Sequence, residues 1–239
     1  MNKINPALKP KVLQVTGLFE GGYLAGDFDG QGASWGPLQW NLGQRTLQPL
    51  LKRIVQLDPA TASKILGEKF AEACRKGTPE WFFLNVVCPG GKPTREWSYK
   101  FAQLYKTAAA QQGFTEFAEI RFVYARAICL ALGFETERGF ALAFDVAVQN
   151  GALKTGPRVD HLDMYRRFLP KGELQEWQKL KAFAHAVARC ANPRWYEDVL
   201  SRKLALALGG TDKFGAVHGH RFDLEKDFGI SHQRKWAQE

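Results

Sequence analysis

Signals for the beginning and end of helices recur along the whole chain. Asp58-Pro59, Thr78-Pro79 and Asn192-Pro193 each place a capping side chain before a proline suited to the first helical turn. Glycine is common just after a helix ends, because it adopts left-handed backbone angles at low cost. The glycines expected to end helices are Gly77, Gly113, Gly133, Gly151 and Gly209. These signals for helix starts and ends predict a mainly α protein.

The expected helices follow from these signals and from the spacing of apolar residues. They cover residues 10–20, 46–57, 59–76, 79–87, 94–111, 115–132, 136–150, 160–169, 172–190 and 193–208. The segment GDFDGQGASWGPLQWNLG, from Gly26 to Gly43, is rich in glycine and aromatic residues and predicts a turn leading into a short strand or hairpin. The tail after Gly209 predicts loop and short strand. The expected class is therefore mainly α, formally α+β, with a small β-hairpin.

Length and charge limit the organisation and the partners. A chain of 239 residues with 45% hydrophobic residues buries a substantial core, and the absence of repeats and linkers predicts one domain over residues 1–239. The formal charge of +9 favours a polyanionic partner, which is nucleic acid, anionic lipid or the peptidoglycan of a bacterial wall.

Location and redox chemistry are also constrained. No stretch approaches the roughly eighteen apolar residues of a membrane span, and the start MNKINPALKPKVLQV has no export signal. Synthesis in the cytoplasm is therefore expected. The cysteines lie in apolar segments without a CxxC pair, so they are expected to be buried hydrophobes rather than disulfides or zinc ligands. They are Cys74, Cys88, Cys129 and Cys190.

One carboxylate falls at the end of the first expected helix. Val12, Val15 and Phe19 share a helical face, so Glu20 lies on the last turn, before Gly21. The negative end of the helix dipole and the apolar neighbours both favour the protonated form of this side chain. A general acid needs that form.

A second carboxylate, Asp29, follows nine residues later in the sequence D-F-D-G-Q-G. Gly30 and Gly32 permit a tight turn, and the polar setting favours the ionised form. A protonated and an ionised carboxylate form the pair that glycosidases use, and Ser34 is placed to hold the attacking water. The structural alternative is a capping Asp and a solvated Glu.

A calcium loop is the metal alternative for the same segment. Asp27, Asp29, Gln31 and Gly32 match the opening of such a loop, but Leu38 stands where a bidentate glutamate is required. We therefore expect no metal and no cofactor.

These residues resemble those of a known family. Glu20 at a helix end, followed by Asp29-Gly30-Gln31-Gly32-Ala33-Ser34, resembles the catalytic segment of family 46 chitosanases. The segment FDGQGASWGPLQWNLGQRTLQPLL is still more similar to peptidoglycan-cleaving relatives among phage endolysins and secreted antibacterial effectors. Further similarity lies in GFALAFDVAVQNG and in YEDVLSRKLALA followed by AVHG.

The resemblance implies a lysozyme-like, two-lobed fold with the hairpin near the active site and substrate between the lobes. It implies that Glu20 protonates the glycosidic oxygen, that Asp29 activates water, and that Ser34, where chitosanases have Thr, orients that water. The acid and base are closer in sequence here than in chitosanases. Inversion at the anomeric carbon requires carboxyl groups roughly 6.5 to 9.5 Å apart.

Charge distinguishes between the substrates of this family. Chitosan is a polycation that a chain of charge +9 repels, whereas peptidoglycan carries carboxylates. Aromatic and amide side chains around the base suit sugar stacking and hydrogen bonds to N-acetyl groups. These expected substrate-binding residues are Tyr23, Trp35, Gln39, Trp40, Asn41 and Gln44. For Trp35 and Trp40 a place in the core is equally expected.

Asp145 lies in the apolar segment ALAFDVAV and is expected to be buried and structural. It then needs a cation, for which Arg121, Arg126 and Arg202 are the candidates. Solvated helix faces are expected for a group of cationic side chains: Arg166, Arg167, Lys179, Lys181, Arg202 and Lys203.

His218 and His220 form an H-x-H pair near Asp223. A metal site there needs a third spaced ligand, so a structural or substrate-contact role is expected instead.

The expected function is therefore inverting cleavage of peptidoglycan glycan strands by a lysozyme-like muramidase. A chitosanase is the first alternative, and a non-enzymatic basic protein that binds the wall or nucleic acid is the second. A wall hydrolase acts in the periplasm or cell wall after delivery by a phage lysis system or a contact-dependent secretion machine, and such an effector has an immunity protein. We expect a monomer that binds no nucleic acid, since no helix-turn-helix or zinc-finger pattern is present.

Overall fold

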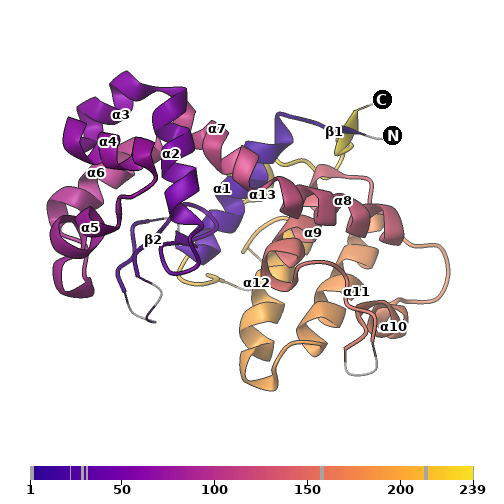
Figure 1. Cartoon of the computed structure of the whole chain (residues 1–239). Helices are drawn as coiled ribbons and strands as arrows, with labels where there is room; N and C mark the ends of the chain where they lie inside the picture. The colour runs from indigo at the N-terminus through magenta and orange to yellow at the C-terminus, as the bar shows by residue number, and fades with distance from the viewer. Residues whose placement is uncertain are drawn as a thin grey trace. The chain divides into compact units, whose positions relative to one another are not determined.

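The computed structural model describes residues 3–21, 23–27, 30, 32–156, 159–212 and 215–238. Helices account for most of these residues, and the strands are short (Figure 1). The expectation of a mainly α fold with a small hairpin is confirmed. The chain divides into two compact units, Thr16–Ala118 and a second made of Met1–Val15 with Glu119–Glu239.

The unit Thr16–Ala118 carries the hairpin. It contains the end of α1 (Leu8–Glu20), β2 (Ser34–Trp35), β3 (Trp40–Asn41), α2 (Leu47–Leu57), α3 (Pro59–Leu66), α4 (Glu68–Lys76), α5 (Glu80–Phe82), the π-helical η1 (Phe83–Val87), the 3-10 turn η2 (Pro89–Gly91), α6 (Arg95–Tyr105) and α7 (Ala108–Phe117). Helix α2 packs against α4 and α7, so it forms the centre of this helical group.

The other unit contains the longest helices. Its elements are β1 (Lys3–Ile4), the start of α1, α8 (Glu119–Leu132), α9 (Glu137–Asn150), α10 (His161–Phe168), α11 (Glu176–Arg189), the 3-10 turn η3 (Pro193–Trp195), α12 (Tyr196–Leu208), α13 (Leu224–Phe228) and β4 (Ala237–Gln238). Strands β1 and β4 pair antiparallel, with Lys3 opposite Gln238, so the two ends of the chain lie side by side (Figure 1).

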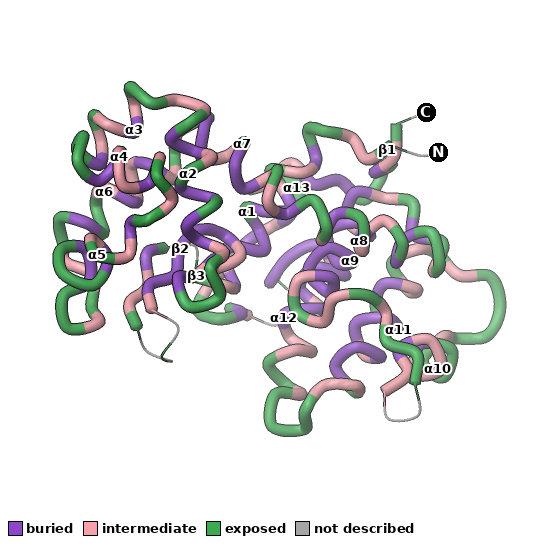
Figure 2. The backbone as a smooth tube through the Cα atoms, viewed as in Figure 1, coloured by how far each residue is buried: buried purple, intermediate pink, exposed green. Residues whose placement is uncertain are grey.

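Helix α9 forms the core of this second unit. It packs against α8, α11 and α12, and Figure 2 colours it as buried over most of its length. Its sequence is apolar on every face, which is the pattern of a helix buried on all sides. The Thr136 hydroxyl accepts a hydrogen bond from the Gly139 amide at 3.1 Å and caps its start, and Gly151 ends it.

Several expected helices are divided in the structure. Residues 115–132 form the end of α7 and the whole of α8, which are separated at Ala118. Residues 59–76 form α3 and α4 rather than one helix, because Gly67 between them has a φ of +87°. Residues 94–111 do not form one helix either, since α6 ends at Tyr105 and the Thr107 hydroxyl caps a new helix by accepting from Ala110 N. Capping by Thr107 competes with helix continuation at a residue that the apolar spacing does not distinguish.

Gly113 was expected to end a helix, and that prediction is wrong. It lies inside α7, where a Cβ would come within 2.8 Å of Ile54 Cγ1 on α2. The glycine therefore serves close helix packing rather than termination. The expected helix 172–190 also begins later, at Glu176, and the tail contains α13, which the sequence did not indicate.

The cysteines are free thiols, three of them buried and Cys190 partly exposed. Burial raises the pKa of Cys74 to about 12 and that of Cys88 to about 11, so neither is a reactive thiolate near neutral pH. Among the described residues, no helix has the length and apolar character needed to cross a membrane.

Candidate functional site

Glu20 is the last residue of α1, as expected, and its side chain is partly exposed. The helix stops there because Gly21 adopts a φ of +93° and donates its amide hydrogen to Gly17 O at 3.0 Å. Tyr23, just after this end, is 77% exposed. Glu20 therefore combines a fixed helix end with access from solvent.

A close contact fixes this end of α1 against the hairpin turn. Gly17 sits within the helix, and a Cβ at this position would lie only 2.9 Å from Pro37 Cβ. Pro37 belongs to the turn that joins β2 to β3. The absence of a side chain at Gly17 lets the helix that carries Glu20 and the hairpin that carries Ser34 approach each other.

The hairpin pairs Ser34 with Asn41 and Trp35 with Trp40. The turn between the strands closes with a hydrogen bond from Gln39 N to Gly36 O at 3.0 Å. A third segment joins the pair, since Ala25 and Ser34 exchange backbone hydrogen bonds of 2.8 and 3.1 Å. Ser34 thus lies on the central segment of a small, fully hydrogen-bonded ribbon.

The side-chain amide of Gln39 ties this ribbon to the segment after Glu20. Its Nε2 donates to Tyr23 O at 3.2 Å and to Gly36 O at 3.0 Å. Both partners are carbonyl oxygens, so the orientation of the amide is fixed and Oε1 faces Ser34. Ser34 Oγ donates its only proton to this oxygen at 2.9 Å. The lone pairs of Ser34 Oγ are left to accept hydrogen bonds.

Gln39 makes these bonds from a left-handed backbone conformation, with a φ of +50°. This region is uncommon for residues other than glycine and costs about 1 kcal/mol or more. Three side-chain hydrogen bonds offset that strain and hold the amide in place.

Asp29, the expected base, lies outside the described residues. The ends of its loop are described. Asp27 N donates to Gly91 O at 2.8 Å, and Asp27 Oδ1 accepts a hydrogen bond from Gly32 N at 3.0 Å. A Cβ at Gly26 would come within 2.1 Å of Gly91 O, so only glycine fits there. Asp27 therefore closes the loop.

Trp35 and Trp40 anchor the hairpin in the core. Trp35 has no exposed surface and meets Phe101 and Phe114 edge-on, with ring centroids 5.1 and 5.0 Å away. Trp40 is 8% exposed and stacks on Phe114. A sugar does not reach the Trp35 ring in this structure, so the core role holds for that residue.

The remaining expected substrate-binding residues lie nearer the surface. Asn41 Oδ1 accepts a hydrogen bond from Gln44 N at 2.8 Å and shapes the turn after β3. Gln44 and Tyr23 are exposed, and Asn41 is partly so. Their contact with substrate stays a prediction.

Asp145 is buried at the centre of α9, as expected. Arg202 donates to both its carboxylate oxygens, at 2.6 Å from Nη2 and at 3.0 and 3.1 Å from Nε, which confirms one of the cations predicted for it. Lys203 Nζ also bonds Asp145, and it bonds Gln149 Oε1 at 2.6 Å. The expectation that Arg202 and Lys203 face solvent is wrong, since both are buried.

Burial alone would raise the pKa of Asp145, but the charges of Arg202 and Lys203 outweigh it and lower the pKa below its ordinary value. The carboxylate is ionised and committed to these two cations. It holds α9 to α12 and is not available as a catalytic acid.

The histidine pair does not form a metal centre with Asp223 in the described part of the chain. His218 Nε2 lies 3.0 Å from Asp198 Oδ1, and Asp223 Oδ1 accepts from Glu225 N and Lys226 N at the start of α13. Asp223 is therefore a helix cap.

Sequence reasoning missed Gly17 and the loop-closing role of Asp27. The signal for Gly17 was a glycine inside an amphipathic helix, which usually has a packing reason. The signal for Asp27 was its place just before a glycine-rich turn, where aspartate side chains bond backbone amides.

No known protein family's sequence profile matches this chain, and no curated protein sequence does. Solved structures do resemble it. The native chitosanase from Bacillus subtilis MY002 has a TM-score of 0.51 at 14% identity, covering 99% of this chain and 100% of that chain. A variant of this chitosanase complexed with 6 GlcN gives the same values. A complex of the family 46 chitosanase from Gynuella sunshinyii with chitotetraose has a TM-score of 0.47 at 16% identity, covering 87% and 88%.

The likeness to the Bacillus subtilis enzyme extends over nearly the whole of both chains. It shows the fold: this chain has the mainly α, lysozyme-like fold of the Bacillus subtilis chitosanase, as the sequence resemblance implied.

Proposed function

We propose that this protein is a glycoside hydrolase that cleaves the glycan strands of bacterial peptidoglycan. The observation that carries the proposal is the placement of Glu20, a partly exposed carboxylic acid at the end of α1. Gly17 packs that helix end against the hairpin that carries Ser34. The shared chitosanase fold supports a glycosidase.

The 6 GlcN complex supports a role for a glutamate near the N-terminus. It was formed by a chitosanase variant in which a glutamate near the N-terminus is replaced by alanine. Glu20 lies equally near the N-terminus of this chain, and the two chains match over nearly their whole length.

The proposed reaction is a single displacement at the anomeric carbon. Glu20 gives its proton to the glycosidic oxygen while Asp29 takes a proton from the attacking water. Ser34 Oγ cannot donate to that water, because its proton goes to Gln39. It accepts the second hydrogen of the water instead, which turns a water lone pair towards the anomeric carbon. The product has inverted configuration.

Charge supports peptidoglycan as the polymer. The formal charge of +9 attracts the carboxylates of muramic acid and the peptide stems, and it repels the ammonium groups of chitosan. Action in the periplasm or wall, delivery by a phage or secretion system, and an immunity protein belong to this proposal as well.

Chitosan hydrolysis is the second candidate. The observation that favours it is that the Bacillus subtilis protein of the same fold is a chitosanase. The two candidates share Glu20 and Asp29 and differ only in the polymer.

Mass spectrometry of digested polymers separates these candidates. Purified sacculi and chitosan are each incubated with the protein, with Glu20→Gln, and with Glu72→Gln as the matched control, since Glu72 pairs with Arg75 on α4. We expect new reducing-end muropeptides from sacculi with the wild-type and control proteins only. Products from chitosan alone favour the second candidate, and retention on sacculi without any cleavage contradicts both.

A further inference from the structure

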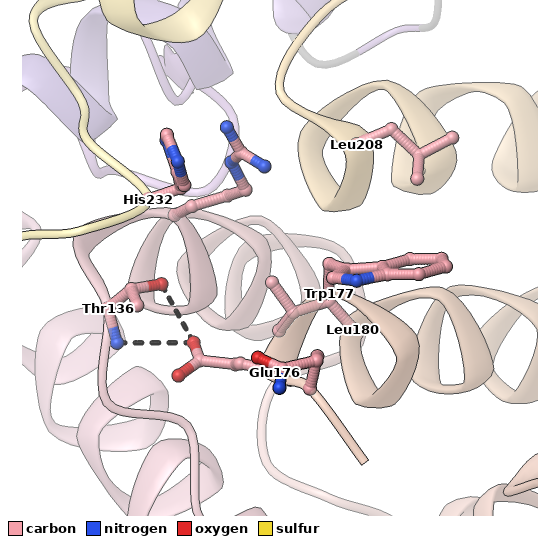
Figure 3. A pocket seen from close by; sticks show the side chains of 8 residues that line it. Thr136, Glu176, Trp177, Leu180, Leu208 and His232 are labelled. Atoms are coloured by element: carbon pink, nitrogen blue, oxygen red, sulfur yellow. Dashed lines mark hydrogen bonds between the residues drawn. The ribbon is translucent and has the colours of Figure 1, made fainter.

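A pocket in the unit made of Met1–Val15 and Glu119–Glu239 has the features of a second ligand site. It has a volume of about 340 Å³. The residues around it come from the start of α9, the start of α11, the end of α12 and the C-terminal segment; they are Thr136, Arg138, Gln175, Glu176, Trp177, Leu180, Leu208 and His232. Figure 3 shows Trp177, Leu180 and Leu208 on one side and Thr136 and His232 on the other.

The guanidinium of Arg138 has no hydrogen-bonding partner within the described part of the chain. Its Nε is buried and makes no hydrogen bond. The group lies against the backbone at the end of α12, where a Cβ at Gly209 would come within 2.6 Å of its Nη2. Burial lowers the pKa of Arg138, although nearby carboxylates act in the opposite direction. Partly buried cations are normally paired, so this one is set up to bind an anion.

The carboxylates near Arg138 accept hydrogen bonds from other donors. Glu176 accepts hydrogen bonds from Glu135 N, Thr136 N and Thr136 Oγ1, at 2.7 to 3.1 Å, as Figure 3 shows for Thr136. Glu225 accepts from Ser231 and lies beside His232. Asp223 caps α13. Each balances part of the charge of Arg138, and none takes its hydrogen bonds.

The apolar side chains of the pocket suit the binding of a sugar ring. Trp177 is 50% exposed although it lines a concave site, and Leu180 is buried beneath it. An exposed indole face packs well against the apolar face of a pyranose. A guanidinium beside it recognises a carboxylate through two parallel hydrogen bonds.

We infer that this pocket binds a carboxylate-bearing sugar unit, with Arg138 on the carboxylate and Trp177 against the ring. The choice of N-acetylmuramic acid among such sugars rests on the proposed function. The pocket and the hairpin of Ser34 belong to different units, so occupation of this pocket gives the protein a second point of attachment to the polymer.

Calorimetric titration of the full chain tests this inference with two monosaccharides. N-acetylmuramic acid and N-acetylglucosamine differ by the lactyl carboxylate, so we expect at least about tenfold tighter binding of the former, equivalent to about 1.4 kcal/mol. D-Lactate alone should bind more weakly than N-acetylmuramic acid, because it lacks the ring. Equal affinity for the two sugars overturns the inference.

Variants locate the binding. Arg138→Gln should lose the preference for the acidic sugar, Arg138→Lys should keep part of it, and Trp177→Ala should weaken both sugars. Arg75→Gln is the control, because Arg75 is ion-paired on α4. Unchanged affinity in a folded Arg138→Gln or Arg138→Lys protein contradicts the site.

The outcomes separate this site from the proposed activity. Arg138-dependent binding without cleavage of sacculi leaves the pocket standing and removes the proposed function. Cleavage of sacculi without Arg138-dependent binding supports the proposed function and removes the pocket.

Discussion

Glu20 and Asp145 both occur in apolar helical sequence, yet the structure gives them opposite surroundings. Glu20 ends α1 and keeps contact with solvent, whereas Asp145 lies at the centre of α9 with no exposed surface. A carboxylate in the middle of a helix buried on all sides needs cations to remain charged, and Arg202 and Lys203 supply them. Position along a helix thus separates a fully buried carboxylate from one that solvent reaches.

The largest effect on stability is expected at the structural carboxylate. Asp145→Asn leaves Arg202 and Lys203 buried without their counter-charge, which should lower the free energy of unfolding by about 3–5 kcal/mol. Urea denaturation measures it, with Asp163→Asn as the control, because Asp163 forms an exposed pair with Arg167. If Asp145→Asn lowers the free energy of unfolding no more than Asp163→Asn does, the contrast drawn between Asp145 and Glu20 is wrong.

The same ion cluster predicts a pH dependence. The pKa of Asp145 is lowered in the folded state, so its contribution is present above its ordinary value of 3.8 and is lost as pH falls through the folded value. Acid unfolding of Asp145→Asn should lack this component.

A smaller effect is expected where α1 meets the hairpin. In Gly17→Ala the new methyl group is too close to Pro37, and this overpacking should lower the free energy of unfolding by about 1–3 kcal/mol. Alanine's higher helix propensity offsets about 1 kcal/mol of that loss. Displacement of Glu20 from Ser34 should also lower the cleavage rate by about tenfold to a hundredfold. Thermal unfolding and initial rates of sugar release measure the two effects. Wild-type stability and rate in this variant mean that the contact does not position Glu20.

Gln39→Met tests the orientation of Ser34. The variant removes the acceptor for the Ser34 proton, so the hydroxyl is no longer held as an acceptor for water. We expect kcat to fall about tenfold, equivalent to about 1.4 kcal/mol, with KM unchanged. Gln56→Met, at an exposed residue of α2, is the matched control for kcat. A rise in KM with constant kcat instead assigns Gln39 to substrate binding.

The smallest effect is expected at a surface ion pair of the hairpin unit. The Arg53 guanidinium donates two hydrogen bonds to Glu116 and, with Gln112, lowers the pKa of Glu116 to about 2. Both side chains are more than a third exposed, so Arg53→Gln should change the stability very little. That contribution is present above pH 4.5 and disappears as pH falls towards 2, and denaturation at pH 7 and pH 2 measures it. If Arg53→Gln lowers the free energy of unfolding as much as Asp145→Asn does, burial does not determine how much an ion pair contributes.

Local signals predicted much of the fold. Gly151 marked the end of α9, and Glu20 fell at the end of α1 as expected. The break at Gly67 depends on its positive φ, and the break at Thr107 depends on competition between capping and helix continuation. Apolar spacing decides neither. The burial of Lys203 was missed because lysine is usually solvated, and only the position of Asp145 in three dimensions makes burial favourable.

The candidate site was predicted in its parts but not in its connections. Ser34 and Gln39 were both chosen as functional residues, but the hydrogen bond between them depends on the left-handed backbone of Gln39 and on two carbonyl partners. Such geometry depends on the turn and not on residue type. For Trp35 the residue type alone left two roles open, because an indole ring suits both sugar stacking and core packing. Its complete burial assigns it to the core.

The most direct test of the central claim is the rate of reducing-end release from purified sacculi by wild-type protein, Glu20→Gln and Glu72→Gln at equal concentration. The account predicts that Glu20→Gln loses at least about a hundredfold in rate, as expected for removal of a general acid, while its thermal stability and that of the control stay at the wild-type value. Release at the wild-type rate by a folded Glu20→Gln protein would contradict the account.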